Sequence, residues 1–178
     1  MVKNKGGGAL MFDLTIGYKK DEIDGSRINI REAVRGVILN EEKLLMIHTN
    51  KGDYKFPGGG VNQNESKLAA LIREIEEESG YEVKAVDRQI GQIIERDMDI
   101  YEENVIFEMI SSYYMCSVTE LQKEQHLDDY EEEMGFRPVW VNIEEAILHN
   151  ERLLESQKDI NLRLKREVLA LKEIKKVI

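Results

Sequence analysis

The sequence predicts a single α/β (α+β) domain whose strands surround one strongly helical segment. The chain has 178 residues, which suits one domain of ordinary size. Hydrophobic residues make up 42% and charged residues 34%, a balance typical of a globular protein rather than a disordered one. Strand-like segments lie on both sides of the helical segment, and no internal repeat or linker divides the chain.

The first part of the chain is predicted to form strands and a glycine-rich loop. Residues 1–8 are polar and rich in glycine, so we expect a flexible N-terminus ahead of a domain over residues 9–178. Apolar runs separated by turn residues predict strands at residues 10–18, 28–39 and 43–48. A glycine-rich loop over residues 51–64 then leads into the helical segment.

Strand patterns return after this helix and are followed by two further helices. The strands are predicted at residues 82–87, 90–96, 104–118 and 137–141, with an acidic stretch at 120–135 before the last of them. Asn142 and Glu145 resemble a capping box that opens a short helix through His149. A last helix is expected over residues 157–176. Its apolar stripe either packs on the domain or forms a homodimer contact, and it consists of Ile160, Leu164, Val168 and Leu171.

The charge and cysteine content exclude several classes of protein. With 25 basic and 35 acidic residues the net charge is −10, so we expect no stable nucleic-acid partner. No apolar run approaches the roughly 18 residues of a membrane-spanning helix, and the N-terminus lacks the apolar core of a signal peptide. The single cysteine, Cys116, cannot form an internal disulfide. We therefore expect a cytoplasmic protein without a membrane segment.

The helical segment carries three glutamates on one ridge. Asn64 or Ser66 is a suitable N-cap and Gly80 a suitable C-terminal residue. Glu74, Glu77 and Glu78 are spaced i, i+3 and i+4, which places them within an arc of about 100°. Two carboxylates about 4 Å apart in a cleft repel by about 4 kcal/mol at an effective dielectric near 20. A divalent cation removes that repulsion, and all-oxygen ligation suits Mg²⁺ or Mn²⁺ better than zinc. A solvated acidic face is the alternative.

The segment before the helix strengthens the metal-site interpretation. Phe56-Pro57-Gly58-Gly59-Gly60 allows the backbone to adopt positive φ and to approach a ligand closely. Loop and helix together have a defined spacing of fixed positions, namely Gly59, Glu65, Arg73, Glu74, Ile75, Glu77, Glu78 and Gly80.

This spacing resembles the Nudix box of hydrolases that act on nucleoside diphosphates linked to another group. The box covers residues 59–81, and the only departure is Tyr81, where the family usually has an aliphatic residue. The resemblance implies an α/β/α sandwich with a mixed sheet, and Mg²⁺ or Mn²⁺ held by the glutamates of the ridge and the Gly59 carbonyl. It also implies water attack on a pyrophosphate, with Arg73 orienting the carboxylates.

The general base and the substrate contacts are less tightly specified by the resemblance. In some family members the base belongs to the box, and in others to a downstream loop. The acidic stretch offers Glu131, Glu132 and Glu133, among which we favour Glu133. Substrate contacts are predicted at Lys55 and Tyr54, and Glu65 is expected to support either the loop or a water molecule at the substrate-binding site.

The substrate is inferred by elimination and remains open among several nucleotides. ADP-ribose pyrophosphatases typically carry a proline some fifteen residues after the box, where this chain has Asp97-Met98. A MutT-like nucleoside triphosphate pyrophosphohydrolase is therefore favoured. ADP-ribose and dinucleoside polyphosphate hydrolases are the alternatives, together with a non-catalytic module that binds a nucleotide and regulates a partner.

Overall fold

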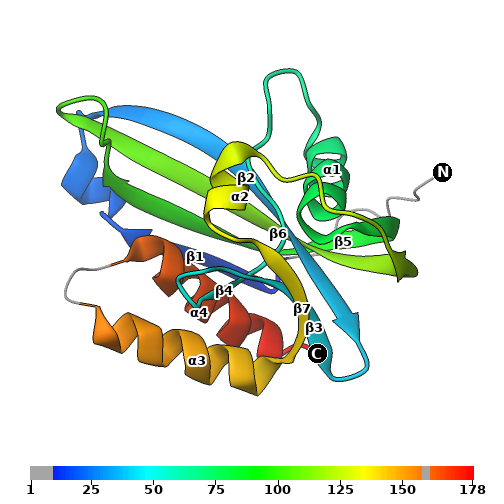
Figure 1. Ribbon diagram of the computed structural model, residues 1–178. Helices are drawn as coiled ribbons and strands as arrows, with labels where there is room; N and C mark the ends of the chain where they lie inside the picture. Colours follow the sequence, from blue (N-terminus) through cyan, green and yellow to red (C-terminus); the bar gives the residue numbers. More distant parts are fainter. Residues whose placement is uncertain (1–9, 158–160) are drawn as a thin grey trace.

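The computed structural model describes residues 10–157 and 161–178, so the predicted flexible N-terminus lies outside the described residues. Within these ranges a seven-stranded mixed sheet has helices on both faces (Figure 1). The strands are β1 (Phe12–Gly17), β2 (Arg27–Asn40), β3 (Lys43–His48), β4 (Tyr54–Lys55), β5 (Tyr81–Met98), β6 (Val105–Gln122) and β7 (Arg137–Asn142). The helices are α1 (Lys67–Ser79), α2 (Asp129–Glu133), α3 (Ile143–Ser156) and α4 (Leu162–Lys175), and a short 3-10 helix spans Lys20–Ile23.

The sheet combines parallel and antiparallel pairs. Its strands are ordered β1-β5-β6-β2-β3-β4, and β7 pairs with β3. β1 runs parallel to β5 and β2 runs parallel to β6, whereas the other neighbours are antiparallel. The segment after β4 adds to the edge of β2, because the amides of Val34 and Gly36 donate to the carbonyls of Gly59 and Pro57 at 3.0 and 2.8 Å. This pairing fixes the glycine-rich loop beside the sheet.

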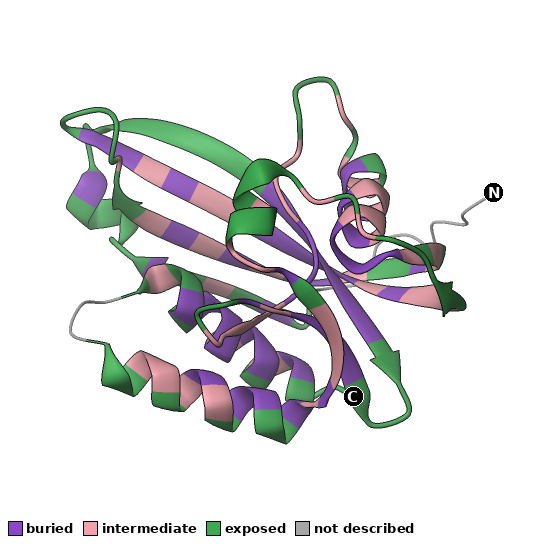
Figure 2. Ribbon diagram, in the orientation of Figure 1, coloured by how far each residue is buried: buried purple, intermediate pink, exposed green. Residues whose placement is uncertain are grey.

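Two apolar cores lie on opposite faces of the sheet (Figure 2). Side chains alternate along each strand, so neighbouring residues enter different cores. Val37 of β2 and Tyr113 of β6 face α3 and α4, together with Ile147 and Leu171. The opposite face packs on α1, and its core contains Val34, Ile38, Leu45, Leu71, Ile75 and Tyr114. The predicted α/β/α sandwich with a mixed sheet is thereby confirmed.

Three predicted element boundaries are wrong. The strands predicted at residues 82–87 and 90–96 form one strand, β5, because β6 pairs along its whole length and register shifts absorb the irregular pattern. α3 continues through Ser156 instead of ending at His149, and its buried Asn150 bonds the backbone of Tyr54 on β4. α4 begins at Leu162 with Asn161 as its N-cap, while Gln157 is extended. The predicted stripe residue Ile160 lies outside the described residues.

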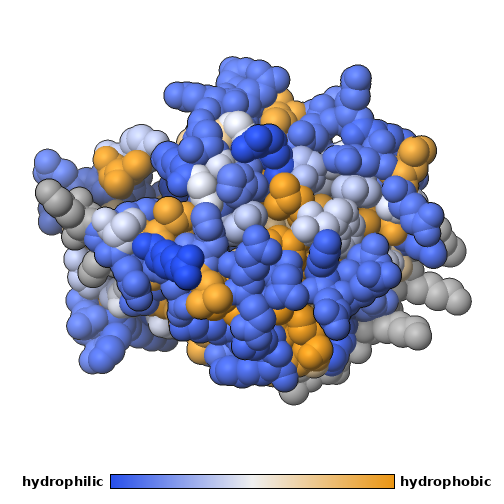
Figure 3. Space-filling model, turned by 60° about the horizontal axis from the view of Figure 1, so that its bottom comes forward, coloured by the Kyte–Doolittle hydropathy of each residue, from blue (hydrophilic) through white to orange (hydrophobic). Residues whose placement is uncertain are grey.

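The apolar stripe of α4 packs within the chain. Leu164, Val168 and Leu171 are at most 5% exposed, and the helix covers β1 and β5 beside α3. On the face turned forward in Figure 3, hydrophilic residues predominate and apolar residues form small separate groups. In the part of the chain that the structure describes, no helix is both long enough and apolar enough to cross a bilayer. A homodimer stays a prediction.

Candidate active site

α1 is built by local signals that the sequence carries. Ser66, and not Asn64, is the N-cap, and its hydroxyl accepts from the Ala69 amide at 3.1 Å. Gly80 ends the helix in the left-handed region, with φ of 73°. The apolar stripe of α1 packs on the sheet, which directs the opposite ridge toward the glycine-rich loop.

Arg73 connects three carboxylates of the box. Its Nε and Nη2 donate to the two oxygens of Glu65 at 2.8 and 2.9 Å, and its Nη1 donates to Glu74 at 2.7 Å and to Glu77 at 3.0 Å. The forked pair of bonds to Glu65 is the strong form of an arginine–carboxylate contact. These bonds lower the pKa of Glu65 to about 2 and raise the pKa of Arg73. The guanidinium therefore keeps Glu65 ionised and holds all three carboxylates in a fixed orientation.

A carboxylate from outside the box completes the cluster. Single oxygens of Glu74, Glu78 and Glu131 lie within 4.8 Å of one another. Glu131 comes from α2, whose N-terminus is capped by Asp128. Asn50 anchors the other end of α2, since its amide donates to Met134 and its side chain to the Glu133 carbonyl, both at 2.8 Å.

The predicted base Glu133 does not belong to this carboxylate cluster. On this short helix Glu131 is partly buried against the cluster, whereas Glu133 is exposed. The two positions are two residues apart, so they face different sides of a helix. The geometry favours Glu131 over Glu133 as the downstream carboxylate of the site.

Glu78 is the most deeply placed carboxylate of the cluster. It is 1% exposed, its Oε2 accepts from the Gly58 amide at 2.7 Å, and Lys55 Nζ lies 3.8 Å from its Oε1. Burial raises the pKa of Glu78 to about 7, although Lys55 and the Gly58 amide oppose the shift. Burial also raises the pKa of Glu131. Carboxylates gathered in this way favour a neighbouring positive charge.

The glycine-rich loop lies directly against these carboxylates. A Cβ atom on Gly59 would overlap the Glu74 carboxylate, and a Cβ on Gly58, whose φ is 137°, would overlap the Val34 carbonyl. The Gly59 carbonyl accepts one bond from the Val34 amide and keeps a second lone pair. Only glycine fits these two positions, which explains the composition of the loop.

Buried charges behind the loop fix its position. Arg35 of β2 donates to the Gly58 carbonyl, and burial lowers its pKa. Glu167 of α4 accepts from the Phe56 amide at 3.1 Å and from Arg166 at 2.7 Å. Arg166 also donates to Glu95 of β5 at 2.6 Å. The last helix thus holds the loop that faces the carboxylates.

The donor set fits a hard divalent cation. The converging ligand atoms are carboxylate oxygens beside glycine carbonyls, without histidine or cysteine among the clustered residues that the structure describes. Oxygen ligands of this kind suit Mg²⁺ and Mn²⁺. Glu74 and Glu78 belong to the cluster, whereas Glu77 is held beside it by Arg73 and its side chain is 40% exposed.

The predicted substrate contacts lie in three different environments. Lys55 reaches the cluster and lies over the Phe136 ring, and its burial lowers the pKa of its ammonium group. Tyr54 is the adjacent strand residue, so it points to the opposite face, where its ring packs against His48 and His149. Glu65 uses both oxygens on Arg73 and also accepts from the Asn62 amide at 3.0 Å, which fits the predicted role in supporting the loop.

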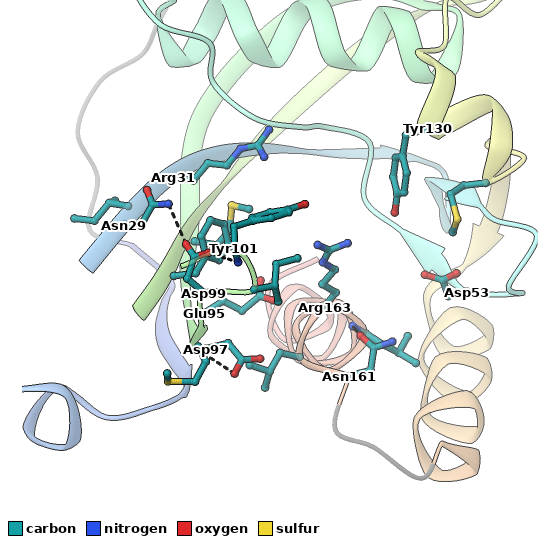
Figure 4. A pocket seen from close by; sticks show the side chains of 18 of the residues that line it. Asn29, Arg31, Asp53, Glu95, Asp97, Asp99, Tyr101, Tyr130, Asn161 and Arg163 are labelled. Atoms are coloured by element: carbon teal, nitrogen blue, oxygen red, sulfur yellow. Dashed lines mark hydrogen bonds between the residues drawn. The ribbon is translucent and has the colours of Figure 1, made fainter. Parts of the chain in front are cut away.

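A cavity of about 1020 Å³ opens beside α2 (Figure 4). It extends from Tyr130 and Met134 along the inner face of the sheet to Tyr101, past the first residues of α4. Arg31 lines it and contacts the Gly60 backbone, so the cavity begins at the glycine-rich loop.

Sequence reasoning missed Arg31, Arg35 and Glu167. Arg35 is a single charge in the apolar run Ala33–Ile38, and Glu167 lies on the buried side of α4 beside Val168. For Arg35 and Glu167, the sequence feature that could have revealed them was a charged residue at a position where the pattern calls for an apolar one. Arg31 has no comparable pattern around it.

Comparisons with known proteins agree with this geometry. The family model of the NUDIX domain matches residues 29–164. Nudix hydrolase 8 of Arabidopsis thaliana is 23% identical over 130 residues, which cover 68% of this chain and 33% of that protein. Diphosphoinositol polyphosphate phosphohydrolase 3-beta of Homo sapiens is 27% identical over 111 residues, which cover 60% of this chain and 59% of that protein.

A solved structure supports the same fold. The MutT NUDIX hydrolase from Burkholderia pseudomallei superimposes with a TM-score of 0.52 at 16% identity, over 82% of this chain and 98% of that one. The chain spans between one third and three fifths of the length of the two curated relatives. The family model covers most of the chain, including the loop, α1 and α2. The chain belongs to the Nudix family.

Proposed function

We propose that this protein is a divalent-metal-dependent pyrophosphohydrolase that cleaves a P–O–P bond in a nucleotide. The observation that carries the proposal is the convergence of Glu74, Glu78 and Glu131 within 4.8 Å, beside a guanidinium that already orients Glu65 and Glu77. Mg²⁺ or Mn²⁺ would be bound by Glu74, Glu77 and Glu78, with the Gly59 carbonyl as a further ligand.

The residues of the chain have separate tasks in this reaction. A cation held by these carboxylates would supply Lewis-acid polarisation of phosphoryl oxygens and a lowered pKa of water. Arg73 holds the carboxylates in one orientation, and Glu131 is positioned to accept the proton of the attacking water. Lys55 is close enough to Glu78 to contact substrate phosphate oxygens at the same place. The buried loop excludes bulk water behind the cluster.

A nucleoside triphosphate is the substrate that we favour. ADP-ribose and dinucleoside polyphosphates are the alternatives. The relative from Homo sapiens is named for a diphosphoinositol polyphosphate, but the cavity does not suit so anionic a ligand. Its charged residues are three basic ones, Arg31, Lys51 and Arg163, and four acidic ones, Asp53, Glu95, Asp97 and Asp99.

A non-catalytic regulatory module is the second candidate. All box carboxylates are present and arranged by Arg73, which supports an enzyme. We place the protein in the cytoplasm, since its one cysteine, Cys116, is buried and has no second cysteine to pair with.

The test is hydrolysis of a panel of pyrophosphate compounds, with the released phosphate, pyrophosphate and nucleoside monophosphate separated by chromatography. The panel contains canonical dNTPs, ADP-ribose, a dinucleoside polyphosphate and a diphosphoinositol polyphosphate, each with Mg²⁺ and with EDTA. We expect Mg²⁺-dependent turnover of a nucleotide and none of the inositol phosphate. Nucleotide binding without turnover would support the regulatory module.

Magnesium is expected to stabilise the protein without substrate. If Mg²⁺ binds the folded protein with a Kd of about 1 mM, 10 mM Mg²⁺ raises the free energy of unfolding by about 1.4 kcal/mol. For a chain of this length that raises the Tm by roughly 3–6 °C. Differential scanning fluorimetry with Mg²⁺ and with NaCl of equal ionic strength measures the shift.

The matched variant for this measurement is Glu78→Gln, which keeps the side-chain volume and removes a charge from the cluster. Its Tm is expected to respond much less to Mg²⁺. An equal response in both proteins would show that Mg²⁺ binds elsewhere.

A further inference from the structure

The cavity beside α2 has one side toward the glycine-rich loop and one side toward α4. On the loop side Arg31 of β2 contacts Gly60, and Tyr130 immediately precedes Glu131 of the carboxylate cluster. On the α4 side Arg163 projects from the first turn of the helix (Figure 4). A substrate cleaved at the carboxylates would therefore extend past Arg31 toward Arg163.

The cationic side chains of the cavity are free to meet a ligand. In the described ranges neither Arg31 nor Arg163 forms an ion pair with a carboxylate, and both are exposed. Two carboxylates of the cavity, in contrast, already accept hydrogen bonds from other side chains of the protein. Glu95 accepts from Arg166 at 2.6 Å, and Asp99 accepts from Asn29 at 3.1 Å.

The walls of the cavity suit a flat, weakly polar group. Tyr101 and Tyr130 are exposed aromatic residues, and Phe107, Met109 and Leu164 complete this part of the lining. Aromatic side chains are the surfaces on which nucleobases stack. The volume of about 1020 Å³ is at the upper end of ligand pockets, so a nucleoside fits without rearrangement.

We propose that this cavity binds the nucleoside part of the substrate and that Arg163 determines base specificity by donating to acceptors on the base edge. The proposal rests on the proposed function, because it takes the cleaved phosphates to lie at the carboxylates. A guanidinium fork matches adjacent acceptors on a base. Arg31 then contacts the phosphate chain, where its charge is next to the glycine-rich loop.

The experiment compares Arg163→Ala with wild type and with Arg152→Ala. Arg152 is an exposed arginine of α3 that does not line the cavity, so it controls for the loss of a surface charge. For the best nucleotide of the panel we expect Arg163→Ala to raise KM at least about tenfold, with kcat within about twofold of wild type. The differences in kcat/KM among nucleotides that carry the four different bases should become smaller. An unchanged KM, or a loss confined to kcat, would overturn the proposal.

A binding measurement separates this proposal from the proposed function. Calorimetric titrations use α,β-methylene nucleoside triphosphates and methylenediphosphonate, which has no nucleoside, in the presence of Mg²⁺. Arg163→Ala should weaken binding of the nucleotide analogues only. The assignment would be contradicted if Arg163→Ala and wild type bound the nucleotide analogues with equal affinity. It would also be contradicted if the substitution weakened binding of the analogues and of methylenediphosphonate equally. If wild type binds the analogues but hydrolyses no nucleotide, the hydrolase proposal fails while this test still decides the role of Arg163.

Discussion

Replacing Glu77 by glutamine is expected to lower kcat/KM by about 100-fold or more. The change preserves side-chain size on the ridge but removes the charge of a predicted metal ligand and weakens its contact with Arg73. Loss of a group that ligates a metal or orients its ligands typically costs at least 10- to 100-fold. Steady-state kinetics at saturating Mg²⁺ measure the effect, and circular dichroism verifies the fold.

Glu76→Gln is the matched control for this substitution. Glu76 lies on the same helix but bonds the Val83 amide at 3.1 Å, away from the cluster, and a glutamine oxygen can accept the same bond. Its activity should remain near that of wild type. Full activity of Glu77→Gln would remove Glu77 from the ligand set, and an equal loss in both variants would point to a general effect of helix charge.

Replacing Glu131 by glutamine is expected to lower kcat by about 10²- to 10⁴-fold with little change in KM, the range typical of a lost general base. Glu131 shares the cluster with Glu74 and Glu78, where the proposed function places the attacking water. Its bond from the Asp128 amide can be kept by glutamine, which preserves the cap of α2. Single-turnover kinetics isolate the chemical step from product release.

Glu133→Gln provides the comparison, because the same short helix carries both glutamates. The exposed Glu133 contributes its backbone carbonyl to Asn50, and this bond does not depend on the side chain. We expect a kcat near that of wild type. A large loss in Glu133→Gln with normal activity in Glu131→Gln would restore the assignment favoured by sequence alone.

Local sequence patterns were sufficient to predict helix α1. The spacing of Leu71 and Ile75 sets its apolar face, Gly80 ends it, and Arg73 lies within reach of carboxylates one and four residues away. Each of these relations acts within a few residues of the chain. They follow from helical geometry, which is why sequence spacing anticipated the ridge, while the family resemblance implied the role of its arginine.

Contacts between distant segments of the chain could not be predicted from local sequence patterns. Whether Glu131 or Glu133 reaches Glu78 depends on how α2 is capped and anchored by Asn50, more than eighty residues earlier in the chain. β5 is one continuous strand because it pairs with β6 along its length. In the part of α3 beyond His149, the Asn150 side chain bonds the backbone of Tyr54. Such contacts follow from the packing of distant segments and have no counterpart in local periodicity.

The sequence by itself determined the family resemblance, the mixed α/β class, the ridge of glutamates and the glycine loop, because these depend on residue type at fixed short spacing. The tertiary structure alone decided which downstream glutamate joins the ridge, that Tyr54 faces away from Lys55, and that α4 holds the loop through Glu167. It also placed Arg31 and Arg163 around one cavity. The physical reason is that burial and charge pairing between segments depend on sheet order, which no single stretch of sequence encodes.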